Sequence, residues 1–244
     1  MGQVEQLRRV VKKRGWKAAF LDVDDTMISS NYLWEEGLKA FARGIAGVAR
    51  VEEEEVLGRV AEENNRVYRV MGVHPSRFAK IAVAVAGIYG VEEEVAKIMM
   101  RERVRGIYLA TPPLPSETEE VLGVMERVGL KVALVTHSPK GRIKRMMEHW
   151  KLDGKVPVFT ESTIRPKGPG VWRRAVVGME VSGGQAVVVD DKLESIMAAR
   201  EAGIETCVWV TPRWDLYAEG KKPERVPQIS GIGQLVRALV DNFG

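Results

Sequence analysis

The stretch Ala18-Ala19-Phe20-Leu21-Asp22-Val23-Asp24-Asp25-Thr26 decides how the rest of the chain is interpreted. Its apolar beginning predicts a short buried strand, and three acids follow within the next four positions. In open parallel sheets, ligands bind beyond the carboxyl ends of the strands, so acids placed there are candidates for chemistry. Asp and Thr are also common in turns that have no chemical role, so the stretch needs support from the rest of the chain.

Further apolar runs predict four more buried strands, and helix-like stretches separate them from the second strand onward. The five predicted strands span residues 18–23, 131–135, 156–159, 186–189 and 205–210. This alternation is typical of a parallel sheet covered by helices on both faces. The sequence therefore predicts an α/β fold with a doubly wound parallel sheet as its core.

An insertion of about 80 residues separates the first two predicted strands and is far longer than a βα connection requires. Its apolar residues recur at helical spacing, as from Trp34 to Leu38 and Phe41, and about four helices are expected. The predicted division is a core of residues 1–28 and 107–244 and a small α-helical cap of residues 29–106.

The composition excludes several other classes of protein. A chain of 244 residues with 45% apolar residues can bury a full core. No apolar run reaches the roughly 18 to 20 residues of a membrane span, so a cytoplasmic protein with no membrane partner is expected. Cys207 is the single cysteine and lies in an apolar run, which predicts a buried side chain without a redox role. A charged fraction of 29% with few Asn and Gln indicates a heat-adapted, thermophile source.

The net charge of +4 suits an anionic partner, either a phosphorylated metabolite or a nucleic acid. The densest basic cluster shares its segment with apolar residues at helical spacing, so it is interpreted as the solvated face of an amphipathic helix rather than a nucleic-acid site. The cluster consists of Arg8, Arg9, Lys12, Lys13, Arg14 and Lys17.

Polar residues follow three of the other predicted strands. Thr136 comes after the second strand, Lys167 lies in the loop after the third, and Asp190-Asp191 follows the fourth. One basic residue is thus expected among several acids. Carboxylates at close range repel one another unless a cation joins them. Oxygen ligands favour a hard ion such as magnesium, for which Asp22 and Asp191 are the predicted carboxylates.

Such a site predicts hydrolysis of a phosphate ester. With its charge offset by the ion, Asp22 could attack phosphorus and form an aspartyl-phosphate. Asp24, two residues along, could protonate the leaving alcohol and then accept a proton from water. Lys167 and the hydroxyl of Thr136 would hold the phosphoryl oxygens. Ser138-Pro139 is interpreted as an N-cap followed by proline in the first helical position.

These residues resemble the motifs of the haloacid dehalogenase superfamily, in its capped phosphatase-like branch. The first motif, Asp-x-Asp-x-Thr after an apolar strand, is matched by residues 19–28. The second, a strand ending in Thr or Ser, is matched at Thr136; the third, a Lys, at Lys167; and the fourth, an acidic pair, at Asp190-Asp191. The resemblance covers most of the chain.

The resemblance implies a Rossmann-like core, a helical cap in the first insertion, magnesium and the aspartyl-phosphate route. It implies that Asp24 binds magnesium through its backbone carbonyl, which leaves its side chain for proton transfer. Within the acidic pair, it assigns the direct metal contact to Asp191 and a supporting role to Asp190. The partner would be a small phosphorylated metabolite.

The chain departs from the family pattern around the third motif, where Arg165-Pro166-Lys167-Gly168-Pro169 leaves Arg165 as an alternative to the favoured Lys167. Ser195 stands where many relatives carry another Asp or Asn. A 2-haloacid dehalogenase would also use an Asp nucleophile, but it protonates no alcohol and needs no metal, so Asp24 and Asp191 argue against it. A second alternative is a non-catalytic member of the fold that binds nucleic acid or protein through its basic first helix.

Overall fold

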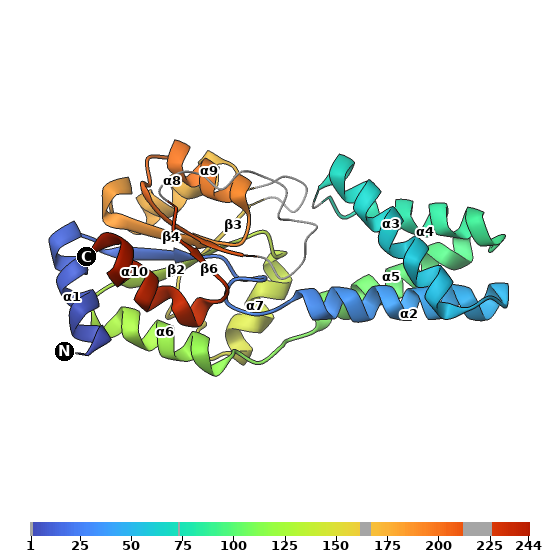
Figure 1. Cartoon of the computed structure of the whole chain (residues 1–244), viewed down its shortest axis with the longest axis horizontal. Helices are drawn as coiled ribbons and strands as arrows, with labels where there is room; N and C mark the ends of the chain where they lie inside the picture. Colours follow the sequence, from blue (N-terminus) through green and yellow to red (C-terminus); the bar gives the residue numbers. More distant parts are fainter. Residues whose placement is uncertain (1, 73, 162–166, 212–225) are drawn as a thin grey trace. The chain divides into compact units, whose positions relative to one another are not determined.

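The computed structural model describes residues 2–72, 74–161, 167–211 and 226–244 (Figure 1). The described residues form two compact units. One contains the chain up to Ser29 and from Pro112 onward, and the other contains the described residues of Ser30–Thr111. The second unit extends past the predicted end at residue 106, because helix α5 (Glu93–Leu109) continues through Gly106.

The first unit is built on one six-stranded sheet in the order β3-β2-β1-β4-β5-β6, and every pair is parallel. The predicted α/β fold with a doubly wound parallel sheet is therefore confirmed. The strands are β1 (Ala18–Leu21), β2 (Lys131–Thr136), β3 (Val158–Thr160), β4 (Ala186–Asp190), β5 (Thr206–Val210) and β6 (Gln228–Ile229). The sequence analysis missed β6, because two residues leave no alternation to recognise.

Helices cover both faces of this sheet, as Figure 1 shows. Alternate strand residues point to opposite faces, so Ala19 and Leu21 pack in one apolar cluster and Ala18 and Phe20 in another. Helices on the first face are α1 (Gln3–Arg14), α6 (Ser116–Arg127), α7 (Lys140–His149) and α10 (Leu235–Phe243). Helices on the second face are α8 (Pro169–Gly178) and α9 (Leu193–Glu201).

The second unit consists of α2 (Asn31–Ala49), α3 (Glu53–Met71), α4 (Arg77–Tyr89) and α5. Each helix buries an apolar stripe at the spacing found in the sequence. Trp34 of α2 stacks on Phe78 of α4 with ring centroids 4.9 Å apart, and Tyr108 of α5 meets Trp34 edge-on at 5.7 Å. Aromatic contacts therefore join three of the helices.

Helix α1 carries the basic cluster except Lys17, which follows the helix, and it packs beside the C-terminal helix α10. Arg8 pairs with Glu5 at 2.6 Å on the same helix. Lys13 donates a hydrogen bond to the carbonyl of Gly244 at 3.3 Å, and Arg14 donates one to the carbonyl of Phe243 at 2.9 Å. Two residues of the basic cluster thus donate hydrogen bonds to the last backbone carbonyls after and within the C-terminal helix. Among all the helices of the described residues, none combines the length and the apolar character that crossing a membrane requires.

Candidate active site

The order of the strands brings the predicted site residues together. Strand β1 lies between β2 and β4, and Leu21 is paired with Leu134 on one side and Val189 on the other. The amide of Asp22 donates a hydrogen bond to the carbonyl of Val189 at 2.9 Å. The residues that follow these three strands therefore meet at one edge of the sheet.

The turn after β1 presents both Asp22 and Asp24 at this edge. Asp25 adopts a left-handed conformation with φ of 62°, which Asp tolerates better than most residues, and its amide bonds the carbonyl of Ile28 at 2.7 Å. The amides of Met27 and Ile28 both donate to the carbonyl of Val23, whose side chain is fully buried. The backbone thus folds tightly around Val23, with one acid on either side of it.

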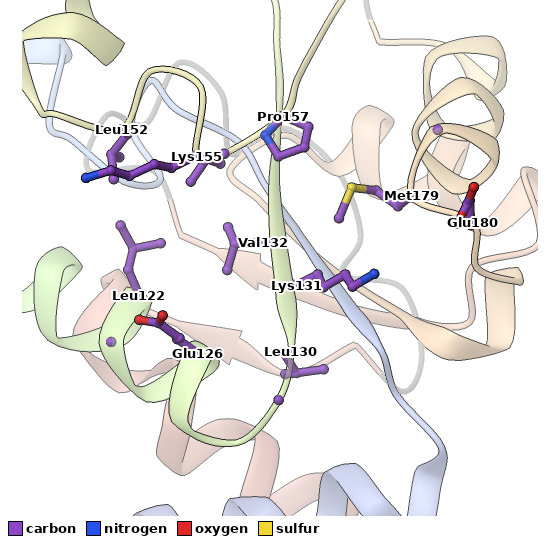
Figure 2. Close-up of a pocket in the computed structure, with 14 residues that line it drawn as sticks. Leu122, Glu126, Leu130, Lys131, Val132, Leu152, Lys155, Pro157, Met179 and Glu180 are labelled. Carbon is purple, nitrogen blue, oxygen red and sulfur yellow. The ribbon is translucent and has the colours of Figure 1, made fainter.

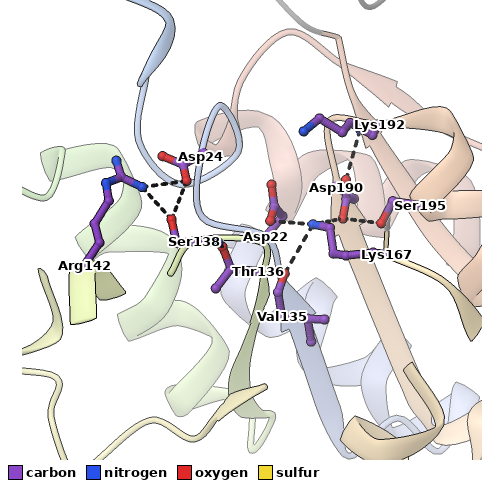
Figure 3. Close-up of polar contacts among 10 residues, drawn as sticks. All are labelled: Asp22, Asp24, Val135, Thr136, Ser138, Arg142, Lys167, Asp190, Lys192 and Ser195. Atoms are coloured by element: carbon purple, nitrogen blue, oxygen red, sulfur yellow. Dashed lines mark hydrogen bonds and ion pairs between the residues drawn. The ribbon is translucent and has the colours of Figure 1, made fainter. Parts of the chain in front are cut away.

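Lys167 lies among the acids, as predicted (Figure 3). Its Nζ is 2.5 Å from Oδ1 of Asp22 and 2.6 Å from Oδ2 of Asp190, and it also donates to the carbonyl of Val135 at 3.3 Å. The Lys167 side chain is only 1% exposed. The other predicted cation, Arg165, lies outside the described residues.

The two acids after β4 have different surroundings. Asp190 is held through both oxygens: the hydroxyl of Ser195 donates to Oδ2 at 2.7 Å, and the amide of Lys192 donates to Oδ1 at 3.0 Å. The indole of Trp209 donates to the backbone carbonyl of Asp191 at 2.9 Å. The side-chain Oδ1 of Asp191, in contrast, is buried and accepts no hydrogen bond from a described residue.

The electrostatics reflect three buried carboxyl groups around one ammonium. Burial raises the pKa of Asp22 well above its ordinary value; the charge of Lys167 opposes this rise, and the charges of Asp190 and Asp191 add to it. Burial, opposed by Lys192 and reinforced by Asp190, raises the pKa of Asp191 to about 7. Burial alone would lower the pKa of Lys167, but the carboxylates of Asp190 and Asp22 raise it above its ordinary value. Lys167 is therefore charged, and it is the cation that pairs directly with Asp22 and Asp190 among the described residues.

These acids fit a metal ion. One carboxylate oxygen from each of Asp22, Asp190 and Asp191 lies within 4.8 Å of the others. A set of oxygen ligands suits a hard divalent ion. Oδ1 of Asp191 is a buried oxygen that has no hydrogen-bond partner among the described residues, so it is available as a ligand. Because Asp190 is already held by Lys167, Ser195 and Lys192, its carboxylate is the least available of the three.

The side chain of Asp24 is held apart from this cluster. Its Oδ2 accepts hydrogen bonds from Ser138 Oγ and from Arg142 Nη1, both at 2.7 Å. Although burial by itself raises the pKa of this acid, the charge of Arg142 and the hydrogen bonds from Arg142 and Ser138 lower it below its ordinary value. Asp24 is thus a carboxylate at neutral pH.

The contact from Ser138 corrects one sequence prediction. Helix α7 begins at Lys140, its N-terminal cap is Pro139, and no side chain caps it. The hydroxyl of Ser138 donates to Asp24 instead, and the backbone amide of Ser138 donates to Thr136 Oγ1 at 3.0 Å. Thr136, one of the predicted phosphate-binding residues, is buried at the end of β2 beside these groups (Figure 3).

Four residues complete the site: Arg142 and Trp209 are not predicted from the sequence, whereas Ser138 and Ser195 are noted there in other roles. Arg142 and Ser138 hold Asp24, and Ser195 and Trp209 hold the acidic pair. Ser195 lies in the first turn of α9, directly after the strand that ends in Asp190, so its closeness to this acid in the sequence carries a weak signal. Nothing in the sequence points from Arg142 to Asp24, since 118 residues separate them.

A cavity of about 660 Å³ lies at the other end of the strands (Figure 2). Its lining includes Lys131 at the start of β2, Pro157 before β3 and Met179 after α8. None of the acids described above lines it. The cluster of acids and the cavity are therefore separate features of the first unit.

Comparisons with known proteins agree with the geometry. The sequence matches the family described as haloacid dehalogenase-like hydrolase over residues 16–203. This span includes every acid of the site as well as Thr136 and Lys167. No curated protein sequence matches the chain.

Solved structures share the fold at low sequence identity. A HAD-hydrolase, YfnB from Bacillus subtilis bound to magnesium, is similar with a TM-score of 0.69 and 13% identity over 92% of this chain and 98% of that one. A predicted phosphoglycolate phosphatase from Haemophilus somnus has a TM-score of 0.62 and 16% identity over 91% and 97% of the two chains. A 2-haloacid dehalogenase from Pseudomonas syringae pv. Tomato has a TM-score of 0.55 and 17% identity over 93% and 99%.

Proposed function

Because the chain belongs to the haloacid dehalogenase-like hydrolases, we propose that it hydrolyses a small phosphate monoester with magnesium, using Asp22 as nucleophile. The hydrolase class follows from the family, which includes enzymes of more than one chemistry. The phosphoester substrate, the metal and the roles of single residues are inferences from the site. The substrate class we propose is a small phosphorylated metabolite in the cytoplasm, selected by the helical unit acting as a cap.

The observation that carries the proposal is the charge balance of the buried acids. Three carboxyl groups lie within reach of one ion, while Lys167 is the cation that pairs with two of them in the described chain. When bound, magnesium would offset this charge and polarise a phosphoryl oxygen. Asp22 and Asp191 would hold it through their side chains and Asp24 through its backbone carbonyl, with Asp190 in support.

The chain's own residues would then divide the reaction between them. A carboxylate oxygen of Asp22 forms a bond to phosphorus while the bond from phosphorus to the leaving oxygen breaks. In the substrate complex the charge of the anionic ester would raise the pKa of Asp24 and favour its protonated form. Asp24 then gives this proton to the leaving oxygen, and in the second step it removes a proton from the water that attacks the aspartyl-phosphate. Lys167 and Thr136 would bind the phosphoryl oxygens, on which charge accumulates.

The dehalogenase alternative makes less use of these groups. Displacement of a halide from carbon releases a stable anion that needs no proton, so the buried pairing of Asp24 with Arg142 would have no purpose. The same reaction needs no cation beside Asp191, whose buried Oδ1 has no partner among the described residues. The site therefore favours phosphorus over carbon as the centre of attack.

The test is hydrolysis of 4-nitrophenyl phosphate by the purified protein, with magnesium and with a chelator. We expect turnover that requires the metal and that Asp22→Asn and Asp24→Asn each reduce by roughly 10²-fold or more. Rapid acid quenching of the wild type should trap a covalent phosphoryl group on the peptide that contains Asp22. Asp153→Asn is the matched control, because Asp153 is an exposed acid that is not among the site residues.

A parallel assay with 2-chloropropionate measures release of chloride. Chloride release without phosphate release would replace the proposal with the dehalogenase reaction. Absence of both activities, combined with salt-sensitive retention of RNA or DNA that is lost on neutralising Arg8 and Arg9, would favour a non-catalytic binding protein.

A further inference from the structure

Arg142, Ser138 and Asp24 form a closed triangle of hydrogen bonds beside the acids (Figure 3). Arg142 Nη1 donates to Asp24 Oδ2 at 2.7 Å and to Ser138 Oγ at 2.5 Å, and Ser138 Oγ donates to Asp24 Oδ2 at 2.7 Å. The Arg142 side chain is 5% exposed and that of Asp24 is 29% exposed. A buried guanidinium on a carboxylate differs from a surface ion pair, which is worth little.

The two oxygens of Asp24 are therefore not equivalent. Both donors converge on Oδ2, whereas Oδ1 is buried and accepts no hydrogen bond from a described residue. A hydrogen on Oδ2 would point at groups that are themselves donors, so a proton on this carboxyl group belongs on Oδ1. In that form, Oδ2 remains a carbonyl oxygen and can keep both of its hydrogen bonds.

We propose that Arg142, with Ser138, is a positioning residue that fixes Asp24 so that Oδ1 is the oxygen that transfers protons. The inference rests on the proposed phosphatase function. Binding of the anionic ester beside Asp24 raises the pKa of this carboxyl group and favours a proton on Oδ1. In the first step, this proton leaves Oδ1 for the departing alkoxide oxygen as the bond from that oxygen to phosphorus breaks. In the second step, Oδ1 takes a proton from water as the water oxygen bonds to phosphorus. Oδ2 stays bound to Arg142 and Ser138 throughout.

Local structure explains how the chain places these donors. Ser138 follows the end of β2, where its amide is anchored on Thr136 Oγ1. Arg142 lies four residues later in the first turn of α7, close enough for its Nη1 to donate a hydrogen bond to Ser138 Oγ. Both donors therefore approach the same oxygen of Asp24 from one side. A precise orientation matters, because proton transfer needs a donor within hydrogen-bond reach of the reacting oxygen.

The test compares kcat/KM for 4-nitrophenyl phosphate and phenyl phosphate, because kcat/KM reports the step in which the ester bond breaks. Phenolate is the poorer leaving group and depends more on a proton from Asp24. We expect Arg142→Ala to lower kcat/KM by about tenfold to a hundredfold on phenyl phosphate and by several-fold less on the nitrophenyl ester, as part of the roughly 10² to 10⁴ that a positioned acid contributes. Arg142→Lys should restore part of the loss.

A double variant separates positioning from a general structural role. Arg142→Ala should cost little on top of Asp24→Asn, because the residue it positions can no longer transfer a proton. Ser138→Ala should give a smaller effect with the same dependence on the leaving group, and it tests the inference if Arg142→Ala fails to fold. The control is Lys144→Ala, which removes an exposed cation from the same helix.

The possible failures are distinguishable. Equal losses on both esters, or a full additional loss in the double variant, would overturn the positioning role while leaving the phosphatase proposal intact. An Asp24→Asn variant that hydrolyses phenyl phosphate as fast as the wild type would overturn the role of Asp24, and the role of Arg142 with it.

Discussion

The side-chain nitrogen of Lys167 lies 2.6 Å from Oδ2 of Asp190, and neither side chain is more than 1% exposed. Removing one member of a buried ion pair leaves an uncompensated charge, which costs about 3–5 kcal/mol. Here the loss would also leave Asp22 without its cation. The ammonium therefore stabilises the fold as well as the proposed phosphoryl group.

We expect Lys167→Met to lower the free energy of unfolding by about 3–5 kcal/mol in the presence of a chelator and to abolish turnover. Urea denaturation followed by circular dichroism would measure the stability. Lys144→Met should change it by less than about 0.5 kcal/mol, because Lys144 is 71% exposed and its pairing with Glu148 is weak. Comparable stability of the two variants would show that the buried pair contributes nothing net.

The sequence predicts the parts of the site that depend on strand ends. Asp22, Thr136 and Asp191 each follow an apolar run, and parallel strands bring such positions to one edge. Lys167 is favoured over Arg165 because of its spacing to the helix that follows. The family resemblance implies separate roles for Asp190 and Asp191, and the two side chains differ in their hydrogen bonds: Asp190 accepts one from Ser195, whereas Oδ1 of Asp191 accepts none from a described residue.

The parts that could not be predicted depend on side chains meeting across the fold. The hydrogen bond from Arg142 to Asp24 depends on the direction in which α7 leaves β2. The spacing of apolar residues in the sequence does not specify this direction. Ser138 was assigned to a helix cap because Ser before Pro is a common start signal, yet its hydroxyl has a stronger acceptor in a carboxylate. Tertiary electrostatics thus overrode a local preference.

The raised pKa of Asp191 predicts a pH dependence of stability. Its folded value of about 7 lies above its ordinary value of 3.8, so the folded protein holds this proton more tightly than the unfolded chain does. The stabilisation is complete below the ordinary pKa and is lost as the pH rises toward 7. We expect the metal-free protein to lose stability between about pH 4 and 7, and Asp191→Asn to lose less. Chemical denaturation in chelator across this range measures the difference; identical profiles would contradict the raised pKa.

Two neighbouring glycines offer a matched test of how β4 is placed. A Cβ on Gly183 would lie 2.1 Å from the carbonyl oxygen of Gly203, whereas a Cβ on Gly184 would meet nothing within 4 Å. Both residues lie in the short helix η1 (Gly183–Gln185) that leads into β4. Gly183→Ala should therefore cost about 1–3 kcal/mol, with Gly184→Ala within about 0.5 kcal/mol of the wild type. Thermal unfolding of the two variants checks this, and equal midpoints would mean that the loop at Gly203 yields easily.

Magnesium binding should be coupled to release of a proton from Asp191. A carboxyl group must be ionised to bind a cation, and burial raises the pKa of Asp191 to about 7. Below that value magnesium has to displace the proton, so its affinity should increase with pH up to about 7 and level off above it. Calorimetric titration in buffers of different ionisation enthalpy counts the protons released. We expect the count to approach about one near pH 6 and to fall toward zero near pH 8.5. Asp191→Asn should bind magnesium weakly without this dependence, whereas Asp153→Asn should match the wild type. A pH-independent affinity in the wild type would mean that Asp191 is not a ligand of the ion.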